Sequence, residues 1–472
     1  MESIIITVLK YVICILINVY TLYSFIVFRR KNNSGKAYVY RIQTLLMFLT
    51  HAACFLCIFL GNDLSNMETV IKLSVFYAAQ VAVFIFAIIL YKVSYKKLSI
   101  LVFNNMLMLL MLGLVMLTRL DFEGAVRQFI FICSGLGLCI IIPFFIKKIR
   151  YLKEFGWLYG FLGLLCLIVV LIFGKAKYGA KNWIFIGSVG LQPSEFVKIL
   201  YVFFVASCFS KAKDFKAVVK VSLLAAIHVI VLVLSKDLGG ALIYFMTYLV
   251  MLYVATCNVF YLVSGILGGS GAAVAAYYIF SHVRVRVIAW KDPFSPNIIQ
   301  NEGWQLAQSL FAIGTGGWFG MGLTKGLPTS IPVVSSDFIF SAIMEEMGGI
   351  VGICIILICL SCFLMFINIS LKMRDDFYRL IALGLSVLYM FQVFLAIGGV
   401  TKFIPSTGVT LPLISSGGSS ILTSLIMFSI IQGLYVLNQD EVDAIEKEKR
   451  ERSQYRANVR KPNEYSDEEQ GY

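Results

Sequence analysis

The amino-acid sequence predicts an all-α polytopic membrane protein with about thirteen transmembrane helices. The chain has 472 residues, of which 59% are hydrophobic and only 14% are charged, and its mean hydropathy is +0.86. Apolar runs of about 20 residues recur from one end of the chain to the other, and each is long enough to cross a bilayer as a helix. Such continuous runs exclude a transmembrane β-barrel, because barrel strands alternate between apolar and polar residues.

The predicted spans divide into two groups. About three lie in an N-terminal accessory bundle over 1–98, and about ten lie in a core over 99–437 that contains a large external loop at 281–337. The first run has no basic stretch before it and no small-residue cleavage site after it, so we expect it to remain as a helix. The expected spans lie near residues 4–28, 40–61, 70–91, 99–118, 125–146, 155–174, 191–209, 218–235, 239–256, 258–280, 338–368, 379–398 and 411–436.

Basic residues gather in alternate loops and predict the orientation of the chain in the membrane. Clusters such as those in 147–153 and 211–220 mark the cytoplasmic side by the positive-inside rule. We therefore expect the N-terminus outside and the C-terminus in the cytoplasm. The segment 438–472 has almost no apolar side chains, so we predict a disordered cytoplasmic tail, or at most a frayed helix after Asp440.

Some lysine and arginine residues lie in external loops, against this charge preference. They include Lys181 in the loop 175–190, and both Arg286 and Lys325 in the loop 281–337. Cations at these places indicate an anionic ligand outside, with contact to lipid headgroups as the alternative. Most prolines fall in or near the same loops, and irregular backbone at membrane depth is tolerated where it lines a watery cavity. We therefore expect a groove that opens outward.

The middle of the long external loop predicts a short interfacial helix over 303–317, which glycines terminate. Gln305, Gln308 and Ser309 are close together at helical spacing, while Leu306 and its apolar neighbours occupy another face. Polar groups followed by exposed glycine backbone suit a hydroxyl-rich or phosphate-bearing ligand, and a packed lid is an equal alternative.

An aspartate lies between this polar loop and the next apolar run. As the N-cap of that helix, Asp337 would stabilise it by roughly 1 kcal/mol. Partial burial would raise its pKa toward a value that suits a general base, while a nearby Arg or Lys or the helix N-terminus would lower it. Glu345 and Glu346 follow two turns deeper and need cationic partners or a cavity, because charges inside the membrane are costly.

Two further helix starts carry charged residues. Glu195 and Lys198 share one face of the helix that begins at Pro193, where they either neutralise each other or hold an anionic headgroup. Asp237 is a candidate cap at another external helix start. The three histidines are isolated in the sequence, so we expect no histidine metal site.

Six motifs follow one another along the core. They are Lys181-Asn182-Trp183-Ile184, 192–198, Asp237-Leu238-Gly239, 305–317, 336–340 with Glu345-Glu346, and 405–420. Their order is that of the SEDS family, the family of RodA, FtsW and SpoVE, which this chain resembles over roughly residues 100–436.

The resemblance implies a ten-helix core that polymerises peptidoglycan glycan strands from lipid II on the outer face of a bacterial cytoplasmic membrane. It also implies a class B penicillin-binding protein as transpeptidase partner, and an inverting glycosyl transfer with Asp337 as general base. A divalent cation, Mg or Mn, is a candidate cofactor for the leaving pyrophosphate; we expect no organic cofactor and no nucleic-acid partner. The residues expected to bind lipid II or the growing glycan strand are Lys181, Trp183, Glu195, Lys198, Asp237, Arg286, Gln305, Gln308, Ser309, Lys325, Ser415 and Ser416.

Four motifs depart from the family pattern, at Asn182, 237–241, 335–337 and 415–420. The charged residues of the motifs are retained, so we favour an active polymerase. Two alternatives stay open: a flippase or transporter of a lipid-linked precursor, and a non-enzymatic scaffold for cell-wall or division proteins. The three N-terminal spans are absent from the common core of the family, and we interpret them as a module for partner docking or regulation.

Overall fold

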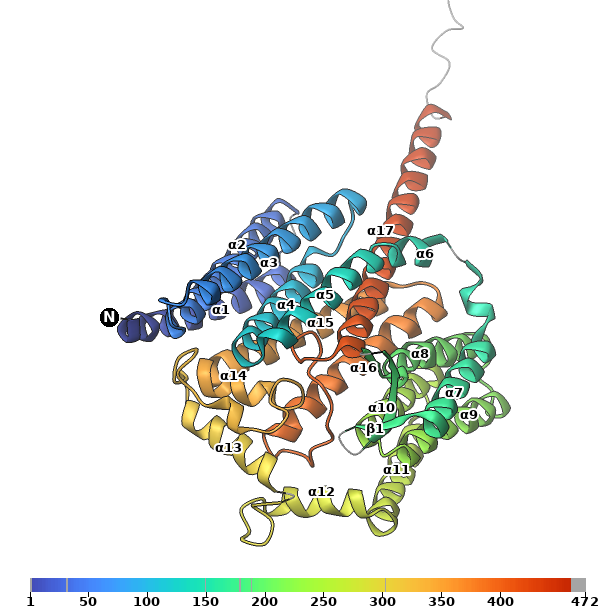
Figure 1. The fold of residues 1–472 in the computed structure, drawn as a ribbon. Coiled ribbons are helices and arrows are strands. Elements are labelled where there is room, and N and C mark those ends of the chain that lie inside the picture. The colour runs from blue at the N-terminus through green and yellow to red at the C-terminus, as the bar shows by residue number, and fades with distance from the viewer. Residues whose placement is uncertain are drawn as a thin grey trace, which may run out of the picture.

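The computed structural model describes residues 2–30, 33–148, 150–177, 180–187, 189–301 and 303–459. Within these residues, thirteen helices are long and apolar enough to cross a membrane, which confirms the predicted all-α polytopic class. The helices form one body, from which the last helix projects (Figure 1).

Three long helices form the N-terminal bundle and lie as a layer against one side of the core (Figure 1). The first two pack along each other. The first also contacts the core helix α15 (Gly349–Lys372), and the second contacts the core helix α4 (Ile100–Leu120). The three predicted N-terminal spans are therefore correct. The bundle consists of α1 (Glu2–Arg29), α2 (Asn33–Gly61) and α3 (Met67–Ser94).

The helix α4 (Ile100–Leu120) is the most enclosed of the thirteen candidate spans, with 94% of its most apolar segment buried. It contacts α2, α5 (Phe122–Cys139), α15 and α17 (Gly418–Val459). Its sequence is apolar on nearly every side, as expected for a helix surrounded by other helices. Near its start, Asn104 and Asn105 are buried and form hydrogen bonds with neighbouring helices.

The remaining core helices bring several helix ends together on one face of the molecule. There, α8, α10 and α17 begin while α4 and α16 end, and hydrogen bonds between α8, α10, α16 and the start of α17 link them. The helix α11 lies at the periphery, where it contacts α10 and α12 and buries no residue (Figure 1). In chain order these helices are α5 (Phe122–Cys139), α6 (Ile142–Lys148), a 3-10 helix (Arg150–Glu154), α7 (Gly156–Phe173), α8 (Pro193–Lys211), α9 (Phe215–Leu234), α10 (Leu238–Thr256), α11 (Val259–Ile279), α12 (Ser281–Lys291), α15 (Gly349–Lys372) and α16 (Asp376–Val400).

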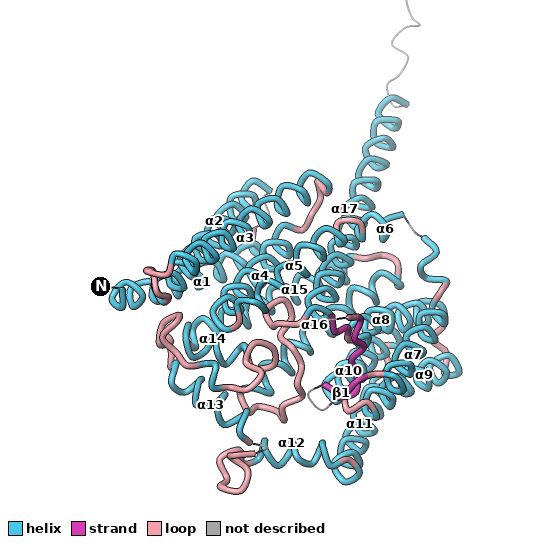
Figure 2. Tube along the Cα trace, in the orientation of Figure 1, coloured by secondary structure: helices cyan, strands magenta, loops and turns pink. Residues whose placement is uncertain are grey.

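The loop expected at 175–190 contains a small antiparallel sheet, which we did not predict from the sequence (Figure 2). Its middle strand is rich in aromatic and β-branched residues, which favour strands. The backbone N–H of Lys181 donates to the carbonyl of Ser235 at 3.0 Å, so the sheet is fastened to the turn before α10. Its strands, in spatial order, are β1 (Lys175–Lys177), β2 (Ala180–Ile186) and β3 (Val189–Leu191).

The span expected at 338–368 is broken near its start, which corrects the sequence prediction. Gly348, with φ +92°, separates a short helix, α14, from α15. A Cβ atom at Gly348 would lie 2.5 Å from the backbone of Phe319, so this crossing of two chain segments requires glycine. The helix predicted over 303–317 is confirmed as α13. The elements of this region are α13 (Trp304–Gly316), a 3-10 helix (Pro328–Ser330) and α14 (Ile339–Met347).

The last transmembrane helix, α17 (Gly418–Val459), starts later than predicted. The span was expected at 411–436, but the chain from 401 to 417 is irregular. Pro405 and Pro412 lie in this segment and interrupt helical hydrogen bonding. The irregular segment therefore lies at the same face as the starts of α8 and α10.

The tail expected to be disordered from residue 438 instead continues α17 to Val459, which corrects that prediction. Ion pairs one turn apart support this exposed helix, for example Arg452 with Glu448 at 2.6 Å. At its base, Lys97 pairs with Asp440 at 2.7 Å. Residues 460–472 lie outside the described part of the chain.

Candidate active site

Asp337 lies in a turn immediately before α14 and is half-buried. The N-cap position of α14 belongs to Phe338, and no side chain caps this helix. The interpretation of Asp337 as an N-cap is therefore wrong, because the helix begins later than its apolar sequence indicates. The carboxylate is not used to start the helix.

Asp337 faces a guanidinium and a glycine from distant parts of the chain. A Cβ atom at Gly408 would lie 3.4 Å from Asp337 Oδ2 and 3.8 Å from Arg286 Nη2. Gly408 has φ +71°, a conformation that L side chains rarely adopt. Arg286 Nη1 donates to the carbonyl of Ser406 at 2.9 Å, which fixes the guanidinium against the same irregular segment.

The electrostatics of this group come from burial and opposite charge. Burial raises the pKa of the Asp337 carboxyl above its usual value, while the Ser336 side chain and the Arg286 guanidinium lower it. Burial lowers the pKa of Arg286, while Asp337 and Asp237 raise it. Both carboxylates therefore favour the charged form of Arg286, and burial has the largest effect on the pKa of Asp337.

Ser415 and Ser416 hold the turn that carries Asp337. The Ser415 hydroxyl donates to the carbonyl of Ser336 at 2.6 Å, and the Ser416 N–H donates to the carbonyl of Ser335 at 2.8 Å. Ser415 is buried. Both residues thus lie within the candidate site, where the hydrogen bonds give them a positioning role.

Gln128 of α5 hydrogen-bonds to the same irregular segment, and it was not identified as a candidate from the sequence. Its Nε2 donates to the carbonyl of Ser415 at 3.1 Å, and its Oε1 accepts from the N–H of Gly417 at 3.2 Å. The sequence signal that could have identified it is a glutamine inside an apolar helix. In the structure its side chain is 3% exposed. Such a residue needs partners at membrane depth.

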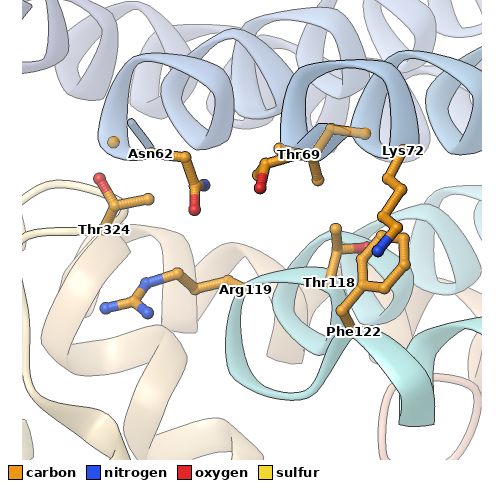
Figure 3. A pocket seen from close by; sticks show the side chains of 9 residues that line it. Asn62, Thr69, Lys72, Thr118, Arg119, Phe122 and Thr324 are labelled. Carbon is orange, nitrogen blue, oxygen red and sulfur yellow. The ribbon is translucent and has the colours of Figure 1, made fainter. Parts of the chain in front are cut away.

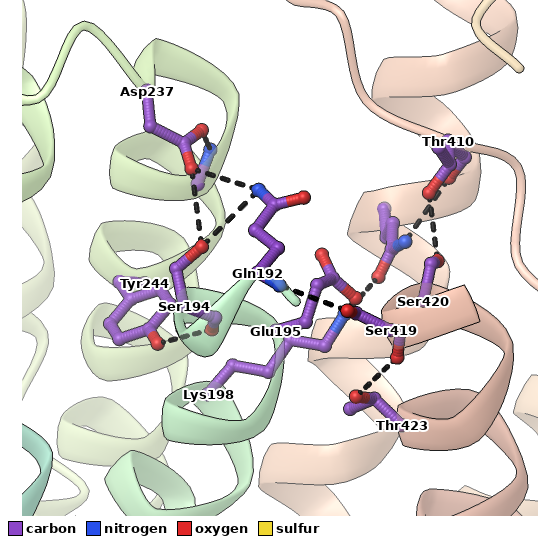
Figure 4. A network of polar contacts seen from close by, with 12 residues as sticks. Gln192, Ser194, Glu195, Lys198, Asp237, Tyr244, Thr410, Ser419, Ser420 and Thr423 are labelled. Atoms are coloured by element: carbon purple, nitrogen blue, oxygen red, sulfur yellow. Dashed lines mark hydrogen bonds and ion pairs between the residues drawn. The ribbon is translucent and has the colours of Figure 1, made fainter. Parts of the chain in front are cut away.

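Asp237 is confirmed as the N-cap of α10, since its Oδ1 accepts from the Gly240 N–H at 2.9 Å. Its other oxygen accepts from Asn182 of β2 at 3.1 Å. The same oxygen accepts from Ser194 of α8 at 3.4 Å (Figure 4). Gln192 reaches the same oxygen at 3.5 Å. Asn182, one of the departures from the family pattern, is therefore a direct partner of Asp237.

Glu195 and Lys198 form the predicted pair, with Nζ 2.7 Å from Oε2 (Figure 4). The side chain of Lys198 is 4% exposed and that of Glu195 is 16% exposed. Lys198 Nζ also donates to Gln392 Oε1 at 2.8 Å, and Gln392 Nε2 donates to the carbonyl of Thr410 at 3.1 Å. The pair thus connects α8 to the irregular segment through a glutamine that we did not predict.

Ser309 differs from its predicted position. It is fully buried, like Leu306, and its hydroxyl donates to the carbonyl of Val400 at 2.8 Å and lies 2.6 Å from the Ser341 hydroxyl. The prediction that Ser309 shares a polar face with Gln305 is therefore wrong. The hydroxyl joins α13 to α14 and to the end of α16, because both are packed against that side of α13.

Five other predicted residues lie nearer the surface. Gln305 and Lys325 are exposed, and Gln308 is half-buried. Lys181 is exposed, and its Nζ donates to the carbonyl of Ile172 at 3.1 Å. Trp183 is half-buried in the sheet, with its ring centre 6.4 Å from that of Phe185. Lys181 thus bonds to the end of α7, and Trp183 packs against a neighbour within the sheet.

Glu345 and Glu346 have partners at the other end of α14. Glu345 Oε1 accepts from the N–H of Leu327 at 2.9 Å, and Glu346 Oε1 accepts from Arg119 Nε at 3.2 Å. Arg119 also reaches the carbonyl of Gly326 at 3.4 Å. The two glutamates therefore hold the loop before α14.

The fold and this group of residues define a class: a polytopic helical membrane protein with a carboxylate–guanidinium site where several transmembrane helices begin or end. Comparison with known proteins gives the family. The FtsW, RodA and SpoVE family model, described as "Cell cycle protein", matches residues 98–439. The chain belongs to this family, and the N-terminal bundle precedes the matched region.

Individual relatives agree with the family assignment. The chain is 37% identical over 350 residues to "Peptidoglycan glycosyltransferase RodA" of Mycobacterium tuberculosis, covering 68% of this chain and 74% of the relative. It is 31% identical over 352 residues to "Stage V sporulation protein E" of Bacillus subtilis, covering 69% of this chain and 93% of the relative.

Solved structures share the fold. One is described as "Structural coordination of polymerization and crosslinking by a peptidoglycan synthase complex"; it has a TM-score of 0.60 at 23% identity and covers 72% of this chain and 97% of that chain. Another, the rod shape determining protein RodA of Thermus thermophilus, has a TM-score of 0.52 at 24% identity and covers 71% of this chain and 95% of that chain.

Proposed function

We propose that the protein is a peptidoglycan glycosyltransferase that polymerises glycan strands from lipid II, with Asp337 as general base. Membership of the FtsW, RodA and SpoVE family and the glycosyltransferase names of relatives support the activity. The observation that carries the assignment to residues is the half-buried Asp337 beside Arg286 and Gly408. Its carboxyl has a raised pKa and is not used as a helix cap.

The reaction assigns a role to each charge. The acceptor 4-hydroxyl attacks the anomeric carbon of the donor, and Asp337 takes the hydroxyl proton. A new C–O bond forms as the bond to polyprenyl pyrophosphate breaks, with inversion at the anomeric carbon. Arg286 would face the negative charge that develops on the leaving group, where a fixed cation in a site sheltered from water is most effective.

The proposed orientation places this site outside the cell. The positive-inside rule assigns the loops 147–153 and 211–220 to the cytoplasm. The candidate site lies at the opposite ends of the helices that these loops join, since α8 starts at Pro193 near the site and ends at Lys211. The N-terminus is then outside and α17 extends into the cytoplasm.

A divalent cation, Mg or Mn, remains part of the proposal. Mg²⁺ in phosphate-transfer sites is usually held by one or two carboxylates together with the substrate phosphates. Asp237, at the start of α10, is the carboxylate that would hold it, and the ion would supply charge for the pyrophosphate. Across the described ranges no group of three or more His, Cys, Asp or Glu forms a metal site, so substrate phosphates would complete its coordination.

We also propose a class B penicillin-binding protein as the partner that crosslinks the product. The similar solved structure whose description names polymerization and crosslinking by a synthase complex supports this choice. In such a pair, the glycan strand made at Asp337 would pass to a transpeptidase on the same side of the membrane.

Purified protein with its candidate penicillin-binding partner, supplied with lipid II, tests the proposal. We expect polymer from the wild type and a loss of at least about 100-fold in rate from Asp337→Asn, which keeps size but cannot accept the proton. Melting temperatures should match, since Asp337 caps no helix. Polymer from the variant at the wild-type rate would remove the catalytic assignment. Lipid II translocation without polymer would favour a flippase, and neither activity would favour a scaffold.

A further inference from the structure

The N-terminal bundle touches the loop between α13 and α14, although it precedes the family match. We call residues 317–327 of this loop the strap. From α1, Lys10 Nζ donates to the strap carbonyl of Gly320 at 3.1 Å, and the Tyr11 ring lies 5.5 Å from the Phe319 ring. The first helix of the bundle thus holds the beginning of the strap.

A closer contact comes from the end of α2. A Cβ atom at Gly61 would lie 2.5 Å from Thr324 Cβ and closer still to Thr324 Oγ1. Real side chains do not approach so closely, so Gly61 is required for the strap to lie at this distance. Thr324 itself has φ +75°, a conformation that costs a residue other than glycine roughly 1 kcal/mol or more. The fold retains a strained threonine against a glycine.

The strap is bonded directly to α14, the helix that follows Asp337. The N–H groups of Met321 and Gly322 donate to the carbonyls of Glu345 and Glu346, both at 2.9 Å. The helix α14 has nine residues and begins two positions after Asp337, so the strap is hydrogen-bonded to the helix that follows directly after the carboxylate. The strap therefore links the bundle to the candidate active site.

A cavity of ≈ 320 Å³ lies beside this junction (Figure 3). It is lined by the end of α2, by α3, by the end of α4, by the start of α5 and by the strap residue Thr324. Its walls include the polar side chains of Asn62, Thr69 and Arg119. The cavity gives the strap room to move sideways. We therefore expect an added side chain at Gly61 to displace the strap while the bundle stays folded.

We propose that the N-terminal bundle is a built-in positioning module for the catalytic carboxylate. The contact between Gly61 and Thr324 sets the position of the strap, and α14 transmits that position to Asp337 opposite Arg286. Gly61 and Thr324 are positioning residues, since they act through the strap. Only the kinetic test of this inference, which measures lipid II polymerisation, rests on the proposed glycosyltransferase function.

Gly61→Ala in the full chain tests the coupling. The new methyl group displaces Thr324, and a misplacement of about 1 Å at a catalytic group costs up to roughly 100-fold in rate. We expect kcat of lipid II polymerisation to fall by about 10-fold to 100-fold with little change in KM. As Asp337 moves from Arg286, the acid limb of the pH profile should shift to higher pH.

Rescue distinguishes positioning from general damage. Thr324→Gly removes the opposing side chain and accepts φ +75° without strain, so the double variant Gly61→Ala/Thr324→Gly should regain kcat and the wild-type pH profile. Gly137→Ala is the matched control, because a Cβ atom there has nothing within 4 Å. Failure of the double variant to recover would overturn the proposal.

Hydrogen exchange of residues 317–338 gives a readout that needs no activity. Exchange should be faster in Gly61→Ala and return to the wild-type rate in the double variant. If Gly61→Ala does not fold, Lys10→Met serves instead: it removes the bond to Gly320 and should raise exchange of the strap several-fold. Unchanged exchange and unchanged kcat would refute the coupling. A third outcome is that exchange rises in Gly61→Ala and returns in the double variant, but the wild type makes no polymer. That outcome would refute the proposed function and would leave the coupling between bundle and strap in place.

Discussion

Asp337 and Arg286 are about fifty residues apart in the chain, and the structure places both beside Gly408. The sequence identified Asp337 because a carboxylate lay at the boundary between a polar loop and an apolar run. It identified Arg286 only as a cation in an external loop. Their proximity depends on the irregular segment 401–417, whose carbonyl at Ser406 holds the guanidinium. No local pattern contains that information, because it arises from packing of distant segments.

The pH dependence of polymerisation should report on this pair. Asp337 acts as a base when deprotonated, so the rate is lost as pH falls through its pKa. Arg286 lowers that pKa, and Arg286→Gln should therefore move the acid limb to higher pH, whereas Arg286→Lys keeps the charge and should shift it less. Initial rates measured across pH for both variants check this. An acid limb that stays in place in Arg286→Gln would show that the guanidinium does not act on Asp337.

At the scale of elements, the start of α8 shows what helical spacing can predict. Glu195 and Lys198 were expected on one face, and their ion pair at 2.7 Å confirms it. The link from Lys198 through Gln392 to Thr410 joins α8, α16 and the irregular segment. A glutamine in an apolar run signals a buried partner, but the identity of that partner is a property of how the helices pack.

Lys198→Met should destabilise the protein by about 3 kcal/mol, because it leaves a largely buried carboxylate without its cation. The double variant Glu195→Gln/Lys198→Met should cost less, since no unpaired charge remains. Thermal unfolding in a lipid nanodisc, compared at one pH, measures both. Equal losses in the single and double variants would show that the two charges do not stabilise each other.

At the scale of the whole molecule, a buried polar network fastens the N-terminal bundle to the core. Asn105 Oδ1 accepts from the hydroxyls of Tyr20 and Ser24 of α1, at 3.0 and 3.2 Å. Its Nδ2 donates to Ser361 of α15 at 3.2 Å, and Gln43 of α2 donates to Ser24 at 2.9 Å. Hydrogen bonds between transmembrane helices fix which faces meet, since apolar faces alone do not distinguish a helix from lipid.

Asn105→Leu should loosen the bundle, because three hydroxyls lose their partner in an apolar region. Each such loss costs on the order of 1 kcal/mol. The neighbouring Asn104→Leu is the matched control: Asn104 is equally buried, but its hydrogen bonds are 3.4 Å long, so the expected loss is smaller. Melting temperature and protease protection of residues 1–97 measure both. A larger effect from Asn104→Leu would contradict this account.

By itself, the sequence determined the membrane class, the number of spans, the short helix α13 and the candidates Asp337 and Arg286, because hydropathy, charge and helical spacing are local properties. It also determined the family through the order of six motifs. The tertiary structure decided the break at Gly348, the sheet at 175–190 and the course of the strap, since these depend on the approach of segments far apart in the chain. It likewise decided that Asp337 faces Arg286 instead of capping a helix: only packing brings an arginine, a glycine and a carboxylate from three separate segments to one place.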